Sequence, residues 1–187
     1  MRITIEQSID KHIETIQKNV YSNIENIEYL TELIISVNNN SGKIFICGNG
    51  GSASDSIHFN AELIVRYSKE RKPIPSICLN TDIGVLTACS NDYSFEEVFS
   101  RQLQALGNSG DLLIAFSTSG KSKNVLKAIE VAEEKNMYTV GFCGKTAMNT
   151  DLDILINSEN TARIQECHSL IYHLVCEELD NNIDQLK

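Results

Sequence analysis

Hydrophobic side chains at the start of the chain recur at helical spacing. Residues 4–39 contain no glycine or proline, and isoleucine, leucine or valine returns every three or four positions. This period gathers apolar side chains on one face of a helix. We therefore expect one long helix or two shorter ones. Because this N-terminal helical arm precedes the first strand pattern, we expect it to pack against neighbouring structure, including another subunit.

Beyond residue 43, short apolar runs alternate with helical segments. Continuous apolar runs of this kind are typical of buried parallel strands. Strands are expected at residues 44–47, 74–79, 111–116, 138–142 and 154–156. Helices are expected after Gly51, in two pieces over 82–106 interrupted near 90–93, over 124–136, and from 161 to about 180.

The alternation of strand and helix predicts an α/β fold. We expect a doubly wound five-stranded parallel sheet flanked by helices. The whole chain, residues 1–187, is expected to form a single domain. Within it, residues 41–187 make the α/β core and residues 1–40 the helical arm. Ligands of such sheets bind beyond the carboxyl ends of the strands.

A glycine cluster follows the first expected strand, in the segment Gly48-Asn-Gly-Gly-Ser52. Glycines permit close approach of the backbone to a ligand, and free N–H groups at a helix start attract anions. The segment also fits the G-x-G-x-x-A dinucleotide pattern. However, Leu79-Asn80-Thr81 ends the second strand where that pattern needs an acidic residue. We therefore favour an anionic small molecule over a dinucleotide.

A second polar loop, Ser117-Thr-Ser-Gly-Lys-Ser122, follows the third expected strand. Four hydroxyls and the start of a helix suit a phosphate group. The alternative is an ordinary helix cap, which would use only one of these hydroxyls. The Gly-Lys-Ser ending superficially resembles a nucleotide P-loop, but Ala115 stands inside the strand where that motif has its first glycine. A phosphate site is the favoured interpretation.

Two helices carry candidate catalytic side chains. His58 and Glu62 share one face of the helix after the glycine loop, with Arg66 one turn further. Gln165 and His173 lie eight positions apart in the last helix. The two helices would bring a carboxylate, two imidazoles and an amide together. The alternative is a surface ion pair and a hydrogen-bonded core histidine.

The other two histidines suggest no chemistry. His12, on the arm, is expected to be solvated, and His168 is expected to be structural. The net charge of −9 and a sequence pI near 4.9 argue against nucleic-acid or membrane-surface binding. Six cysteines without a CxxC pair, and a start without an apolar signal core, predict a reduced, cytoplasmic protein.

Five motifs occur in the order of a known family. They are Gly48-Asn-Gly-Gly-Ser52, His58-x-x-x-Glu62, Asn91-Asp-Tyr93, the serine loop, and Arg163-Ile-Gln-Glu-x-His-x-x-x-x-His173. The chain thereby resembles the sedoheptulose 7-phosphate isomerases (phosphoheptose isomerases) of the sugar isomerase, or SIS, domain superfamily. The resemblance spans nearly the whole chain, including the arm. The serine loop alone specifies only the superfamily.

The resemblance implies an aldose–ketose isomerase. It would convert D-sedoheptulose 7-phosphate to D-glycero-D-manno-heptose 7-phosphate through an enediol(ate), for heptose nucleotides of lipopolysaccharide or capsule. By similarity Glu62 is the base and His173 the acid/base partner. The family also implies one zinc ion per subunit on His58, Glu62, Gln165 and His173. These two assignments compete for Glu62 and His173, because a metal-bound carboxylate is a weaker base.

The resemblance also implies how the substrate is held. The serine loop would bind the phosphate, and the glycine loop would approach the sugar. Arg66 would neutralise either the phosphate or Glu62. The implied substrate-binding residues are Asn49, Gly50, Gly51, Ser52, Arg66, Asp92, Ser117, Thr118, Ser119, Ser122 and Gln165. Ala162 stands where some members have a substrate-binding aspartate, which affects substrate preference.

Members of the family are homotetramers with sites between subunits, so self-association is expected. Two alternatives remain. One is a non-catalytic SIS tetramer that acts as a scaffold for the bacterial replication initiator, and the other is a sugar-phosphate-sensing regulatory protein. A scaffold has no need to keep His58, Glu62, Gln165 and His173 together, so their presence favours the enzyme.

Overall fold

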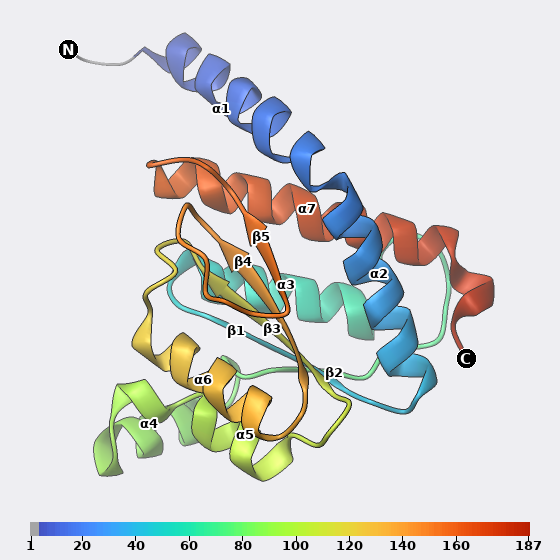
Figure 1. The fold of residues 1–187 in the computed structure, drawn as a ribbon, viewed down its shortest axis with the longest axis vertical. Coiled ribbons are helices and arrows are strands. Elements are labelled where there is room, and N and C mark those ends of the chain that lie inside the picture. The colour runs from blue at the N-terminus through green and yellow to red at the C-terminus, as the bar shows by residue number, and fades with distance from the viewer. Residues whose placement is uncertain (1–3) are drawn as a thin grey trace.

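The computed structural model describes residues 4–187 and contains a parallel sheet between two layers of helices (Figure 1). All five strands run parallel, in the order β2-β1-β3-β4-β5. The doubly wound five-stranded sheet expected from the sequence is therefore confirmed. The strands are β1 (Ile44–Gly48), β2 (Ser76–Cys78), β3 (Leu112–Ser117), β4 (Tyr138–Cys143) and β5 (Leu152–Leu155).

Two strand boundaries differ from the expectation. The strand expected at 74–79 is only three residues long, because Pro75 has no N–H to donate and the Ile74 N–H bonds to the Leu63 carbonyl outside the sheet. The strand expected at 154–156 instead begins at Leu152. The apolar pattern did not reveal the start of this strand, because the carboxylate of Asp153 interrupts it. That carboxylate accepts a hydrogen bond from the Thr150 hydroxyl.

The helices follow the expected order. The break expected near 90–93 falls at Tyr93, after a helix that ends at Asp92. Within residues 4–187, no helix is both long and apolar enough to cross a membrane. The helices are α1 (Ile5–Asn19), α2 (Ile24–Asn39), α3 (Gly51–Ile64), α4 (Ile83–Asp92), α5 (Ser100–Leu106), α6 (Lys123–Glu134) and α7 (Thr161–Asn181).

Alternate strand residues feed two separate cores, one on each face of the sheet. Ile44 and Ile46 of β1 pack with side chains of α2, α3 and α7. Phe45 and Cys47 of the same strand pack with side chains of α5 and α6 on the opposite face. Because alternate residues of a strand face opposite sides of the sheet, α3 and α7 lie in the same layer. The two helices that carry the candidate catalytic side chains therefore share a face of the sheet.

The arm is divided between exposed and buried halves. In α2, Leu30 and Ile34 are fully buried in the core of the same chain. In α1, by contrast, Ile5 is 81% exposed and Ile9 53% exposed. The first helix extends away from the body of the molecule (Figure 1). The apolar face of α1 is therefore largely free, whereas α2 packs on the sheet layer of its own chain.

All six cysteines are buried with free thiols, as the sequence predicts. Burial raises the pKa of the Cys47 thiol, and it raises the pKa of Cys176 to about 12. A thiol is reactive as its thiolate, so these side chains act as small hydrophobic groups.

Candidate functional site

The strand order reverses between β1 and β3, and both polar loops lie at that point. Strands β2 and β1 extend the sheet to one side, and β3, β4 and β5 extend it to the other. Ligands of open α/β sheets bind at the carboxyl ends of the strands at such a reversal. The amides of Asn49 and Asn124 join the two loops by hydrogen bonds of 2.8 and 2.9 Å. The two loops therefore lie side by side at the carboxyl ends of β1 and β3.

The glycine loop is closed by Asn80, which stands where a dinucleotide site needs an acidic residue. Its amide nitrogen donates to the Gly48 carbonyl at 2.8 Å, and its amide oxygen accepts the Gly48 N–H at 3.2 Å. A Cβ at Gly51 would lie 2.4 Å from Nε2 of Gln165, so the glycine leaves room for the Gln165 amide here. Gly50 directly precedes α3, and Ser52 in its first turn is buried.

In the serine loop, the hydroxyls face one another. Ser117 Oγ lies 3.0 Å from Ser122 Oγ and 3.4 Å from Ser119 Oγ. Ser122 occupies the N-cap position of α6 but makes no capping hydrogen bond. This geometry differs from the ordinary helix cap considered as the alternative, because a cap would turn that hydroxyl to the backbone. The cluster and the free N–H groups of α6 suit a phosphate.

Close packing of a neighbouring loop holds the serine loop in place. A Cβ at Gly120, whose φ is +63°, would lie 2.1 Å from the Thr146 carbonyl oxygen. Both the dihedral angle and the contact therefore require glycine. A Cβ at Gly144, on the loop after β4, would lie equally close to the Thr118 carbonyl oxygen. Backbone contacts thus hold the loop that carries the hydroxyl cluster.

His58, Glu62 and His173 come together between α3 and α7. One ligand atom from each lies within 4.8 Å of the other two. Nε2 of His58 is 3.1 Å from Oε1 of Glu62, and the two imidazole centroids are 4.9 Å apart. The His58 side chain is 49% exposed, so the group opens to solvent. Two imidazoles and a carboxylate with an open position are a donor set that suits catalytic zinc.

Gln165, the fourth expected metal ligand, reaches towards the start of α3. It is eight residues before His173 on α7, a rise of about 12 Å along the helix axis. Its amide lies against Gly51 at the start of α3. The structure thus gathers three expected ligands and sets Gln165 beside the glycine loop.

Burial also shifts the pKa values of two side chains between α3 and α7. The pKa of His173 is lowered, first by burial and then by the nearby His58. Burial raises the pKa of the Asp55 carboxyl to about 6. One oxygen of Asp55 is buried without a hydrogen-bonding partner among residues 4–187. The neutral form of His173 is suited to accept a proton near neutral pH.

Two other expected substrate contacts have partners close by in the sequence. Arg66 follows α3 and is 53% exposed, with Nε 4.0 Å from Oε2 of Glu70 rather than beside Glu62. Asp92 is the last residue of α4, and its carboxylate accepts a hydrogen bond from the Asn91 amide at 2.8 Å. Both side chains are exposed, which leaves them free to meet a ligand.

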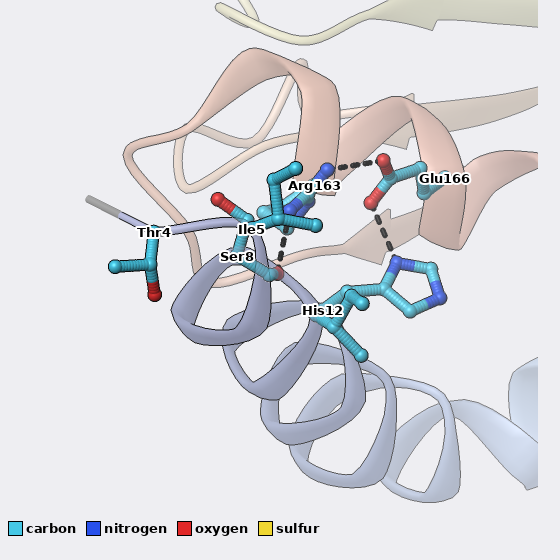
Figure 2. A pocket seen from close by; sticks show the side chains of 7 residues that line it. Thr4, Ile5, Ser8, His12, Arg163 and Glu166 are labelled. Atoms are coloured by element: carbon cyan, nitrogen blue, oxygen red, sulfur yellow. Dashed lines mark hydrogen bonds and ion pairs between the residues drawn. The ribbon is translucent and has the colours of Figure 1, made fainter.

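The expectation that His12 is solvated is wrong. Figure 2 shows its ring directed at Glu166 of α7, with Nδ1 2.6 Å from the carboxylate. On the other side of Glu166, Arg163 donates to the carboxylate and also to the Ser8 carbonyl of α1, the latter at 2.9 Å. The position of His12 on a helix gave no sign of a partner 154 residues later. These contacts tie α1 to α7.

The structural role expected for His168 is confirmed. Its side chain is fully buried, and Nε2 lies 3.0 Å from the Cys143 carbonyl oxygen. Burial lowers its pKa to about 4. His168 therefore holds α7 against the end of β4 as a neutral ring.

The sequence did not point to the partners of the candidate catalytic side chains. The Tyr172 hydroxyl lies 2.9 Å from Nδ1 of His58. Arg71 donates through Nη2 to the Glu62 carbonyl at 2.6 Å, and its Nε lies 3.5 Å from the Asp180 carboxylate. Tyr172 directly precedes His173, which was the one available signal. Arg71 stood in a charged segment that is typical of a loop.

Comparisons with known proteins agree with this geometry. A family model described as SIS domain matches residues 8–144. A phosphoheptose isomerase from Campylobacter concisus is 45% identical over 184 residues, covering 96% of this chain and 97% of that protein. One from Helicobacter pylori is 45% identical over 182 residues, covering 95% of each.

Solved structures show the same similarity. Phosphoheptose isomerase GmhA from Neisseria gonorrhoeae is 36% identical with a TM-score of 0.87, over 95% of this chain and 97% of that one. A phosphoheptose isomerase from Francisella tularensis is 31% identical with a TM-score of 0.86, over 95% and 96%. The family model spans most of the chain and the curated relatives cover nearly all of it. The chain therefore belongs to the phosphoheptose isomerase family of SIS-domain proteins.

Proposed function

We propose that this sugar phosphate isomerase interconverts D-sedoheptulose 7-phosphate and D-glycero-D-manno-heptose 7-phosphate, for heptose nucleotide biosynthesis. The observation that carries the proposal is the convergence of His58, Glu62 and His173, in a chain that also carries a hydroxyl-rich loop after β3. The curated relatives bear the name phosphoheptose isomerase. A scaffold for the replication initiator, or a regulatory sensor, would not need this convergence of three proton-transfer groups.

The reaction moves a proton between two neighbouring carbons and adjusts protons on their oxygens. Glu62 is proposed as the base that carries the proton between C1 and C2. His173 is proposed as the acid/base group for the oxygens, and its lowered pKa favours the neutral ring that accepts a proton. The hydroxyls of Ser117, Ser119 and Ser122, with that of Thr118, hold the phosphate. Binding of the phosphate at this loop positions the sugar for proton transfer.

The donor set also fits zinc, with His58, Glu62 and His173 as ligands and Gln165 as the further ligand proposed by resemblance. A bound zinc ion would supply Lewis-acid polarisation of the substrate oxygens. The protein side chains would still bind the phosphate, orient the sugar and carry the protons. Asn49, Ser52 and Asp92, with the backbone at Gly50 and Gly51, are proposed to contact the sugar hydroxyls. Arg66 is proposed to neutralise the phosphate.

Self-association into a tetramer with sites between subunits is part of the proposal. Large apolar side chains remain exposed on α1 and α3, among them Ile9 at 53%, Ile57 at 45% and Ile64 at 40%. Exposed apolar groups of this kind support an interface between subunits. Sedimentation analysis of the purified protein tests it, and a monomer at micromolar concentration would contradict it.

The enzyme assay uses purified protein with added zinc and sedoheptulose 7-phosphate. NMR follows formation of the aldose and, in D₂O, entry of deuterium at C2. Glu62→Gln should abolish deuterium entry, whereas Glu130→Gln, an exposed position on α6, should leave it unchanged. Elemental analysis of each variant separates loss of the base from loss of the metal. No aldose from an assembled, zinc-loaded protein would contradict the proposed reaction.

A further inference from the structure

Tyr172 contacts the nitrogen of His58 that faces away from Glu62. Its hydroxyl lies 2.9 Å from Nδ1, while Nε2 of the same ring lies 3.1 Å from Oε1 of Glu62. The Tyr172 ring is 1% exposed and stacks on Phe59 with 5.3 Å between ring centres. Packing in the core therefore holds the Tyr172 hydroxyl of α7 against the His58 imidazole of α3.

The hydrogen bonds around His58 form a chain with one direction. A carboxylate can only accept, so in the neutral imidazole the proton lies on Nε2, facing Glu62. Nδ1 is then an acceptor, and the Tyr172 hydroxyl donates to it. The Tyr172 oxygen in turn accepts from the Ser169 hydroxyl at 3.0 Å. Every group in the series Ser169, Tyr172, His58, Glu62 thus has a matching partner.

We propose that Tyr172 is a positioning residue that sets the tautomer and orientation of His58, and so tunes the affinity of His58, Glu62 and His173 for a divalent cation. This inference rests on the metal-binding role proposed above. A histidine that ligates through Nε2 carries its proton on Nδ1 and donates it to a neighbouring acceptor. The Tyr172 oxygen is that acceptor. A hydroxyl both donates and accepts. By rotation of its O–H bond, Tyr172 can therefore donate to Nδ1 when the His58 proton is on Nε2, and accept from Nδ1–H when His58 ligates through Nε2.

Tyr172→Phe isolates the hydroxyl because it keeps the buried ring and its stacking on Phe59. Outer partners of metal ligands typically change metal affinity by roughly 10- to 100-fold. We expect the variant to bind Zn²⁺ and Co²⁺ weaker by about that factor, in competition with a chelating dye, with an unchanged melting temperature. Tyr67→Phe is the matched control, because the Tyr67 ring lies 5.9 Å from the ring of His173. Unchanged affinity in Tyr172→Phe, or an equal loss in Tyr67→Phe, would overturn the proposal.

The tautomer is also measured directly, without metal or substrate. In metal-free protein at about pH 8, above the usual titration range of histidine, ¹⁵N NMR distinguishes the two ring nitrogens. We expect the Nε2–H form of His58 in the wild type and a mixture in Tyr172→Phe. A wild-type ring protonated at Nδ1 would refute the inference even if the variant fails to fold. This measurement is independent of turnover, so failure of the isomerase assay would not affect it.

Discussion

His168 allows a quantitative test of how α7 is held against the sheet. Its ring is fully buried between α7 and the end of β4, with centroids 5.8 Å from Phe116 and 5.6 Å from Phe142. Nδ1 has no hydrogen-bonding partner among residues 4–187. Burial lowers the pKa of His168 from 6.5 to about 4, because the charged ring would lose its hydration. Protonation therefore opposes folding.

The sign and size of the effect follow from these two values. Above pH 6.5 the ring is neutral in both states, and His168 adds no pH dependence. Between pH 6.5 and about 4, the unfolded chain binds a proton that the folded chain does not. The free energy of unfolding therefore falls as the pH falls. From these values, we expect a loss of about 2 kcal/mol between about pH 7 and pH 5.

Urea unfolding of the metal-free protein measures this loss, at one fixed protein concentration because association would add its own stability. His168→Gln is the comparison, since its amide donates to the Cys143 carbonyl and does not titrate. The wild type should lose about 2 kcal/mol more than the variant over this pH interval. An equal loss in both proteins would refute the buried neutral ring.

Three further variants test other contacts. Gly51→Ala should displace the Gln165 amide and lower turnover with little change in melting temperature, because a flexible side-chain end lies in the way. Arg71→Ala should lower the free energy of unfolding in urea by roughly 3–5 kcal/mol, because the Asp180 carboxylate stays buried without its partner charge. His12→Ala should change the free energy of unfolding by less than about 1 kcal/mol, because the His12–Glu166 pair is partly exposed. A small effect at Arg71 or a large one at His12 would contradict these assignments.

The sequence predicted the sheet because its strands are short, apolar and bounded by glycine or polar loops. Burial of every residue in β1 and β3 agrees with the continuous apolar runs. The pattern failed at β5, where Asp153 places a carboxylate within the strand. It also failed to show that α2 packs on its own chain, because helical periodicity specifies a face and not its partner.

The site was predictable only as far as local spacing reaches. The i, i+4 spacing of His58 and Glu62 placed both on one helix face, and the structure pairs them. The partners that hold them come from far along the chain. Tyr172 lies 114 residues from His58, and Arg71 meets Asp180 across the end of α7. Spacing along one helix cannot show which side chain of another helix will face it.

The amide pair between Asn49 and Asn124 has a consequence for the pH dependence of the enzyme. Amides do not titrate, and each of the two side chains both donates and accepts in this pair. The alignment of the glycine and serine loops therefore stays constant while the histidines gain or lose protons. A pH profile of the isomerase thus reports the protonation of its reacting groups, and not a change in the loops proposed to hold the sugar and its phosphate.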